Sequence, residues 1–200
     1  MSSSRLGEVG TASGNAELLI DTPSDVRFER AEVEGGTRVV VGHNGYQTSH
    51  GLTHARTFHL GFEGRALRGE DVLMAMSTDD RRRYDSAFSA SNLQGVDYTI
   101  RFHLHPDVDV TLDMNGTAVS MALKSGEIWV FRVEGDVETS LESSVYLEKS
   151  RLSPRATKQI VLPGRAIEYS PRIIWSLAMP QATPSAVRDD EVEDLQMPVE

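Results

Sequence analysis

Histidine offers the most chemistry in this sequence, and its six copies are unevenly placed. Four lie in the segment 43–59, and the other two, His103 and His105, stand two residues apart. Residues two apart on a strand face the same side, so these imidazoles can reach one metal ion or one sugar ring; zinc would need a third ligand. The alternative is that both belong to the polar outer face of a half-buried strand, beside Arg101.

The first histidine segment predicts contacts with carbohydrate. His50 and His54 have the four-residue spacing that aligns two rings on a helix, but the glycine and the strand-like pattern after His50 argue against a helix there. An Asn-Gly pair at 44–45 predicts a tight turn, after which Tyr46 can present its ring to a sugar. The candidate carbohydrate-contacting residues are His50, His54, Tyr46 and Arg101. Exposed side chains that bind only water are the alternative for this segment.

The remaining charged residues predict no catalytic pair. Glu70 and Asp71 are adjacent, so on a strand they face opposite sides and cannot form the opposed pair of a glycosidase. The arginines at 81–83 can hold a carboxylate or sulfate, but acids flank them, and a solvated loop is the alternative. The sequence contains no nucleophile elbow, phosphate-binding loop, dinucleotide fingerprint or H-E-x-x-H motif, and it has no cysteine. We therefore assign no catalytic residue.

Composition and charge exclude several classes of protein. The 200 residues carry a formal net charge of -10, which argues against generic nucleic-acid binding. No apolar run approaches the roughly 20 residues of a membrane-spanning helix, and the N-terminus has no apolar stretch of the kind found in export signals. We expect neither a nucleic-acid partner nor membrane insertion.

The elements that must position these residues are short strands. Twelve segments with alternating or β-branched residues predict strands, at 16–20, 26–33, 37–43, 55–62, 67–76, 98–105, 108–114, 117–123, 128–135, 141–147, 155–162 and 173–179. Turn residues separate them about every ten positions, including an Asn-Gly hairpin signal at 115–116. The polar stretch 77–92 predicts a long surface loop.

These strands predict an all-β fold: an antiparallel two-sheet β-sandwich of about 11–12 strands, with no substantial helix. The sandwich should span residues 15–179. A flexible N-terminal segment, 1–14, should precede it, and an acidic disordered tail, 180–200, should follow it.

Several segments, in one order, resemble the C-terminal domain of heparinase II/III-like proteins. They are YTIRFHLHPDVDV (98–110), GEIWVFR (126–132), LESSVYLEK (141–149), RATKQIVLPG (155–164) and IIWSL (173–177). Upstream, HNGYQTSHGLTHARTFHL (43–60) and LRGED (67–71) fit the same pattern in the same order. The resemblance covers roughly residues 15 to 178 and implies a β-sandwich domain.

The resemblance also implies a bacterial polysaccharide lyase that performs β-elimination on a uronic-acid polysaccharide. In that family an α/α toroid supplies most catalytic side chains, the early sandwich region adds an essential histidine and zinc ligands, and the proteins work in the periplasm or cell envelope. This sequence shows no toroid, and the family's H-x-H-x-D segment would lie upstream of Met1. We therefore expect little or no lyase activity from these residues alone, with zinc the one cofactor the family suggests.

The expected partners follow from the same resemblance. An acidic polysaccharide is the expected ligand, and a free-standing carbohydrate-binding module is the alternative function. In the family, one face of the sandwich packs against the toroid. Without a toroid, that apolar face should be exposed to solvent. We therefore expect either a separate toroid partner or self-association.

Overall fold

The computed structural model describes residues 3–11, 14–113, 116–149 and 152–180. Its elements, in chain order, are β1 (Arg5–Thr11), β2 (Gly14–Ile20), β3 (Val26–Val33), β4 (Gly36–Tyr46), α1 (Gln47–His50), β5 (Leu52–Gly61), β6 (Ala66–Met74), α2 (Thr78–Ala90), β7 (Val96–His103), β8 (Asp109–Asp113), β9 (Ala118–Ala122), β10 (Ile128–Val133), β11 (Ser140–Tyr146), β12 (Arg155–Ala166) and β13 (Arg172–Ala178).

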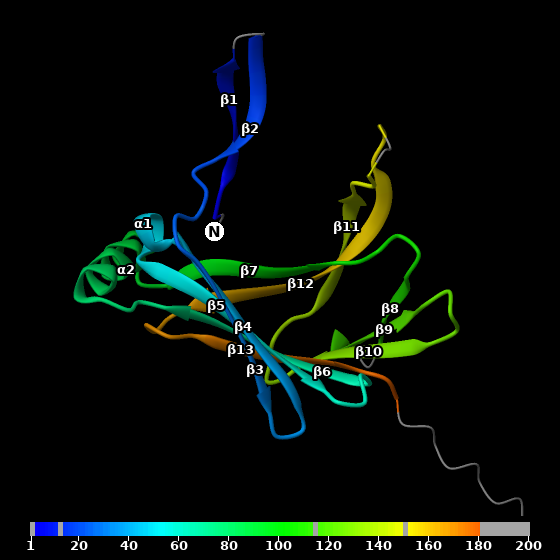
Figure 1. Ribbon diagram of the computed structural model, residues 1–200. Coiled ribbons are helices and arrows are strands. Elements are labelled where there is room, and N and C mark those ends of the chain that lie inside the picture. The colour runs from blue at the N-terminus through cyan, green and yellow to red at the C-terminus, as the bar shows by residue number, and fades with distance from the viewer. Residues whose placement is uncertain (1–2, 12–13, 114–115, 150–151, 181–200) are drawn as a thin grey trace, which may run out of the picture.

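The strands form two packed layers. The larger is an eight-stranded sheet with the order β3-β4-β5-β6-β13-β10-β9-β8, and the smaller is a three-stranded sheet with the order β11-β12-β7. Figure 1 shows the smaller sheet lying across the larger one, with the β1–β2 hairpin projecting from the layers and both helices at one end. Neighbouring strands pair antiparallel throughout the described sheets, so the predicted all-β two-sheet sandwich is confirmed.

Alternating sequence builds the core between the layers. On β7 the apolar side chains of Ile100 and Phe102 turn inward and pack against a cluster that includes Phe131, Ile160 and Trp175. Buried aliphatic and aromatic side chains each contribute roughly 1.5–3 kcal/mol, so this cluster holds the two sheets together. All twelve predicted strands are present, within a few residues at their ends.

The prediction of a loop over 77–92 is wrong, because helix α2 occupies Thr78–Ala90. A capping box begins it: the Ser77 side chain accepts from the Asp80 backbone N–H, and the Asp80 carboxylate accepts from the Ser77 backbone N–H. Only Asp80 and Tyr84 are buried in this helix. So narrow a buried face gives almost no hydrophobic periodicity, which is why the sequence reads as a loop.

The predicted turn at 44–45 is also wrong, because both residues lie inside β4. The Asn44 side-chain oxygen accepts hydrogen bonds from the backbone N–H groups of Ser24 and Asp25, each at 3.1 Å. A side chain that bonds nearby backbone in a turn here joins β4 to the segment before β3 instead. Between His43 and Tyr46 the pairing of β4 with β5 shifts register.

The two ends of the chain differ in what the structure describes. Residues 5–11, within the segment expected to be flexible, form β1 and pair with β2. The acidic tail expected over 180–200 falls, from residue 181 onward, outside the described residues. Within the part that is described, no helix is long and apolar enough to cross a membrane.

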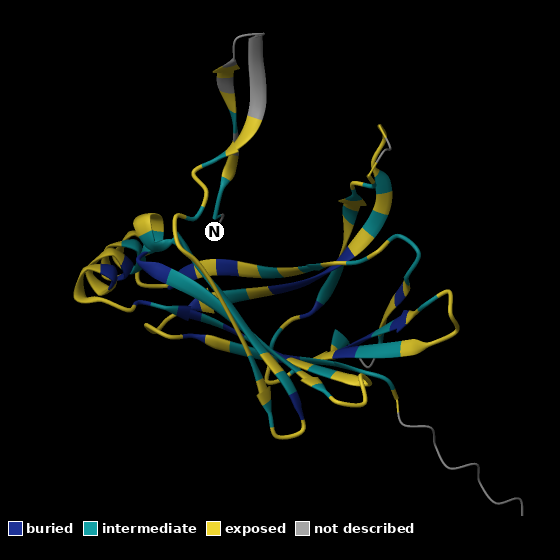
Figure 2. Ribbon diagram, in the orientation of Figure 1, coloured by how far each residue is buried: buried dark blue, intermediate teal, exposed yellow. Residues whose placement is uncertain are grey.

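The smaller sheet leaves part of the larger one uncovered. Directly opposed residues share one face of a sheet, and one such row crosses the face toward the smaller sheet at Phe28, Val41, Arg56, Asp71 and Ile173. On β6, Asp71 of this row is buried. On β3, Phe28 is 70% exposed, and Val26, two residues earlier on the same face, is 71% exposed. Figure 2 shows β3 largely in the colour of exposed residues. The smaller sheet therefore leaves the larger sheet uncovered on the β3–β4 side, which we call the open side.

Candidate functional site

A cavity of about 190 Å³ lies beside β7, over the inner face of β4, β5 and β6. Its wall combines ionisable and aromatic side chains, among them His43, Tyr46, His54, Arg56, Asp71 and Tyr98. Residues at alternate positions of adjacent strands reach the cavity together because they share the inner face.

A chain of hydrogen bonds crosses three strands at the floor of this cavity. The Gly45 backbone N–H donates to Nδ1 of His43 (3.2 Å), so in the neutral His43 ring the proton is on Nε2. His43 Nε2 lies 3.3 Å from Nδ1 of His54, which must therefore accept. His54 Nε2 then donates to Oδ1 of Asp71 at 2.7 Å. The chain has one direction, from the Gly45 amide to the Asp71 carboxylate.

Both nitrogens of both rings are occupied in this chain, so neither ring is free to take a proton from a substrate. Burial and the nearby His54 lower the pKa of His43, which favours the neutral ring that the chain requires. The arrangement holds the irregular end of β4 onto β5 and β6. It positions the groups that line the cavity.

Asp71 is the anchor of the site. Its side chain is 3% exposed and accepts from His54 Nε2 (2.7 Å), Arg56 Nε (2.7 Å) and Trp175 Nε1 (2.8 Å). Burial by itself raises the pKa of Asp71, but the hydrogen bonds from His54, Arg56 and Trp175 outweigh it, so the pKa lies below its ordinary value. The carboxylate is therefore charged and fully partnered.

Arg56 is the group with donors left over. Its Nε bonds Asp71, and its guanidinium carbon lies 4.9 Å from the ring centroid of Phe102 and 5.8 Å from that of Trp175. Among the described residues, its two Nη groups make no hydrogen bond. A guanidinium fixed in this way presents a planar fork that matches a carboxylate or sulfate.

Three of the four predicted carbohydrate-contacting residues line this one cavity: Tyr46, His54 and Arg101. Arg101 does so from the edge of β7, since its guanidinium contacts Glu142 on β11 at 3.2 Å. The fourth, His50, is not in the wall; it is the last residue of α1, and its ring lies 2.7 Å from the Ser49 hydroxyl.

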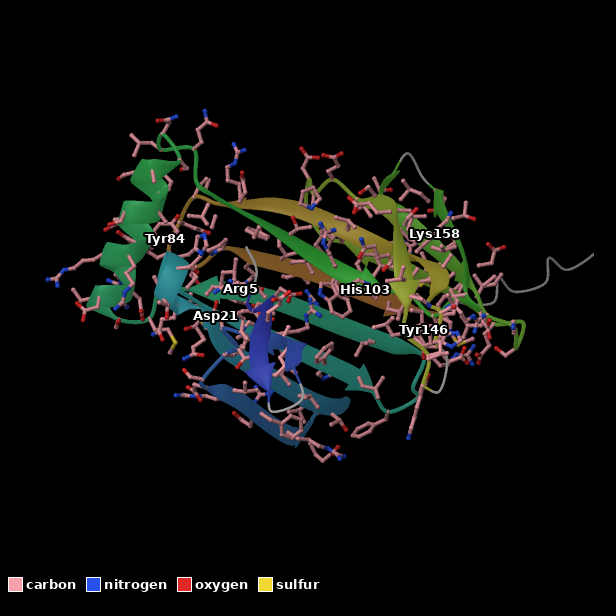
Figure 3. All side chains as sticks on the ribbon, turned by 90° about the horizontal axis from the view of Figure 1, so that it is seen from above. Arg5, Asp21, Tyr84, His103, Tyr146 and Lys158 are labelled. Atoms are coloured by element: carbon pink, nitrogen blue, oxygen red, sulfur yellow. The ribbon has the colours of Figure 1, made fainter. Side chains whose placement is uncertain are left out.

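The candidate metal ligands lie elsewhere. His103 Nδ1 is 2.8 Å from the Ser144 hydroxyl, and the His105 ring accepts from the Asp107 backbone N–H and stacks edge-on against Tyr146. Figure 3 labels His103 and Tyr146 toward the end of the molecule opposite α2. Within the described ranges no group of three or more His, Cys, Asp or Glu could hold an ion. A metal bound by His103 and His105 stays a prediction without a third ligand there.

The sequence pattern did not single out Arg56 and Asp71. Glu70 and Asp71 do face opposite sides, as expected: Glu70 pairs with Arg172 at 2.9 Å, while Asp71 points inward. The signal that was available is the His-x-Arg spacing at 54 and 56, which places both side chains on one face of β5.

The fold and the cavity define a class: an antiparallel two-sheet domain whose cavity is lined by a histidine chain, a buried aspartate and a fixed arginine. The chain belongs to the family "Heparinase II/III-like, C-terminal", whose model matches residues 2–176. This confirms the resemblance seen in the sequence.

Individual relatives are distant. FtsZ-localized protein C of Caulobacter vibrioides is 29% identical over 165 residues, which are 80% of this chain and 26% of that protein. Heparan sulfate lyase HepC of Pedobacter heparinus, in a mutant form, superimposes with a TM-score of 0.58 at 10% identity, over 81% of this chain and 23% of that one. The heparinase III product BT4657 gives a TM-score of 0.57 at 7% identity, over 78% and 22%. The two structures show a shared fold, and this chain spans about a quarter of each relative.

Proposed function

We propose that this chain is the β-sandwich part of a protein that acts on acidic polysaccharide, and that its cavity binds a uronate or sulfated sugar. The observation that carries this proposal is Arg56, which lines the cavity while its Nε is fixed on Asp71. A planar carboxylate accepts two parallel bonds from such a fork. The ring of Phe102 beneath the guanidinium keeps the fork in one orientation.

The rest of the cavity wall suits a sugar ring. Tyr46 and Tyr98 contribute aromatic surface, and sugar sites commonly combine apolar walls with a few fixed polar groups. The single-direction histidine chain adds polar edges to the cavity wall. A negatively charged sugar therefore meets a cation with free donors and two rings.

We further propose that these 200 residues bind polysaccharide without cleaving it. A β-elimination needs a free base, and the ring nitrogens of His43 and His54 are already engaged. Catalytic groups would come from a toroid partner of the family's type. Formation of unsaturated uronate by the purified chain alone would contradict this.

The test of binding is calorimetric titration with heparan sulfate and with polygalacturonate. Charge-assisted bonds contribute about 1.5–3 kcal/mol, so Arg56→Gln should weaken binding roughly tenfold or more. Arg27→Gln, at an exposed arginine paired with Asp25, is the matched control and should bind as the parent does. Because Arg56→Gln also disturbs Asp71, Tyr46→Ala provides a second variant outside that ion pair. Absence of saturable heat from the parent chain overturns the proposal.

A second candidate function rests on the curated relative. The 29% identity to FtsZ-localized protein C exceeds the identity to the two lyase structures, so a protein-docking role at the division site is the alternative. Co-sedimentation of this chain with Caulobacter FtsZ polymers would support it. Pelleting that is the same with and without polymer would exclude it.

A further inference from the structure

Strand β7 is the edge of the three-stranded sheet, and one side of its backbone is unpaired. It pairs with β12 alone among the described strands. The Leu104 N–H donates to the Lys158 carbonyl at 3.0 Å, which sets the alternation of the ladder. In an antiparallel ladder every second residue points its N–H and C=O away from the partner. Counting back from Leu104, the outward residues include Thr99 and Arg101.

A proline confirms this alternation independently. Pro163 of β12 lies directly opposite Thr99, and a proline has no N–H to donate. The pair is therefore a non-hydrogen-bonded one, and Thr99 directs its backbone groups outward. No described residue bonds the Thr99 or Arg101 amide, and both residues line the cavity.

The free edge of β7 faces the cavity, whose other wall is the inner face of β4, β5 and β6. Adjacent strands lie about 4.8 Å apart and stacked sheets about 10 Å, so a strand added next to β7 would lie over β4 and β5. Beneath it would be Arg56 and the apolar side chains of Val41 and Phe28, the last of which is largely exposed. An added strand would close the open side of the sandwich.

The edges of β7 and β3 differ in where their charged side chains lie. On β3, the edge of the larger sheet, Arg30 and Glu32 pair along the strand itself, an arrangement that discourages strand addition. On β7 the charged side chains turn back across the sheet: Arg101 reaches Glu142 on β11, and Asp97 bonds an arginine on β12. The backbone between them is left open.

We propose that the free edge of β7 binds an extended segment of a partner protein as a fourth strand. The regular spacing of outward N–H and C=O groups matches a peptide backbone. Alternate side chains of the added strand would point down into the cavity. Because Asp71 is already saturated, the cation available to them is Arg56, so the segment carries a Glu or Asp flanked, two residues to each side, by apolar residues.

This inference goes beyond the polysaccharide proposal, since it rests on backbone amides that a sugar cannot pair in register. The probe is the synthetic heptapeptide acetyl-Lys-Val-Thr-Glu-Thr-Val-Lys-amide, which places Val, Glu and Val on one face. We expect saturable amide chemical-shift changes at Thr99 and Arg101 of the ¹⁵N-labelled chain. The same peptide N-methylated at every interior residue keeps its side chains but cannot pair, and it should not bind.

Substitution of Thr99 separates backbone pairing from side-chain contact. Thr99→Pro removes an outward N–H that β12 does not use, and prolines are tolerated on strand edges, so peptide affinity should fall about tenfold. Thr99→Val keeps the N–H and should bind like the parent chain. If Thr99→Pro fails to fold, the N-methylated peptide still decides.

Four results overturn the proposal. They are equal binding of the N-methylated peptide, shift changes confined to other surfaces, no change at millimolar peptide, and shifts at these amides that grow with protein concentration alone. The last would show a second copy of this chain on the edge. Binding of polysaccharide is measured separately by calorimetry, so failure of one proposal leaves the other intact.

Discussion

Asp71 organises the site by accepting from three donors on two strands, β5 twice and β13 once. Burying a carboxylate is costly unless it is paired and hydrogen-bonded, and here the pairing fixes both His54 and Arg56. The same interaction thus stabilises the sandwich and leaves Arg56 with its outer donors free. Strand periodicity correctly placed Glu70 and Asp71 on opposite faces. It could not reveal the partners, because the pairing of β6 with β5 and β13 is set by the sheet order, and Trp175 lies 104 residues away in sequence.

At the residue scale, we predict that Asp71→Asn destabilises the chain by about 3 kcal/mol, because it leaves the half-buried Arg56 charge without its partner. The adjacent Glu70→Gln, which breaks a partly exposed pair with Arg172, should cost less than about 1 kcal/mol. Urea denaturation of the two variants measures the difference. Equal free energies of unfolding would show that the Asp71 network does not hold the strands.

At the scale of elements, twelve of the thirteen described strands follow from sequence, and β1 and the helices do not. The twelve strands predicted from alternation and turn residues are all present. Alternation of apolar and polar side chains repeats every two residues, so a short stretch of sequence is enough to reveal it. Helix α2 has no comparable periodic signature, because its stability comes from its capping box and from two buried side chains, Asp80 and Tyr84. Tyr84 donates to the Ala166 carbonyl, 82 residues away in sequence, a contact that no local pattern encodes.

We predict that Ser77→Ala lowers the free energy of unfolding by about 1 kcal/mol, because the first turn of α2 loses its cap. Ser89→Ala, at an exposed position in the same helix, should be neutral or slightly stabilising, since alanine has the higher helix propensity. Thermal unfolding followed by circular dichroism compares them. A Ser77→Ala variant as stable as Ser89→Ala would show that the box is not needed.

At the scale of the whole molecule, the two layers differ in width, and the open side exposes apolar residues at the margin of the larger sheet. The sequence led us to expect exposed apolar surface and self-association, and self-association stays a prediction; Val26 and Phe28 are among the large apolar side chains that the structure exposes. Their positions could not be read from the sequence, because which face of β3 meets the core depends on the extent of the smaller sheet. Val26 and Phe28 alternate on β3 just as buried residues would.

We predict that the parent chain self-associates at tens of micromolar through the exposed margin of β3, with the Thr99 and Arg101 amides of β7 left unpaired, and that Phe28→Glu reduces this association. Phe62→Glu, at a residue of similar exposure in the turn after β5, is the control and should associate like the parent. Sedimentation-velocity ultracentrifugation distinguishes the species. A parent chain that sediments as a monomer throughout this range would show that the open side does not bind a second copy.

The hydrogen bond between the Trp175 indole and Asp71 couples tryptophan fluorescence to the cavity. The sequence has two tryptophans, and Trp175 is buried with its ring directly beside Arg56. An anion arriving at the guanidinium changes the electric field across that indole, and with it the energy of the excited state. Occupancy of the cavity would therefore be reported by the emission of an intrinsic fluorophore, with no label attached and no substrate consumed.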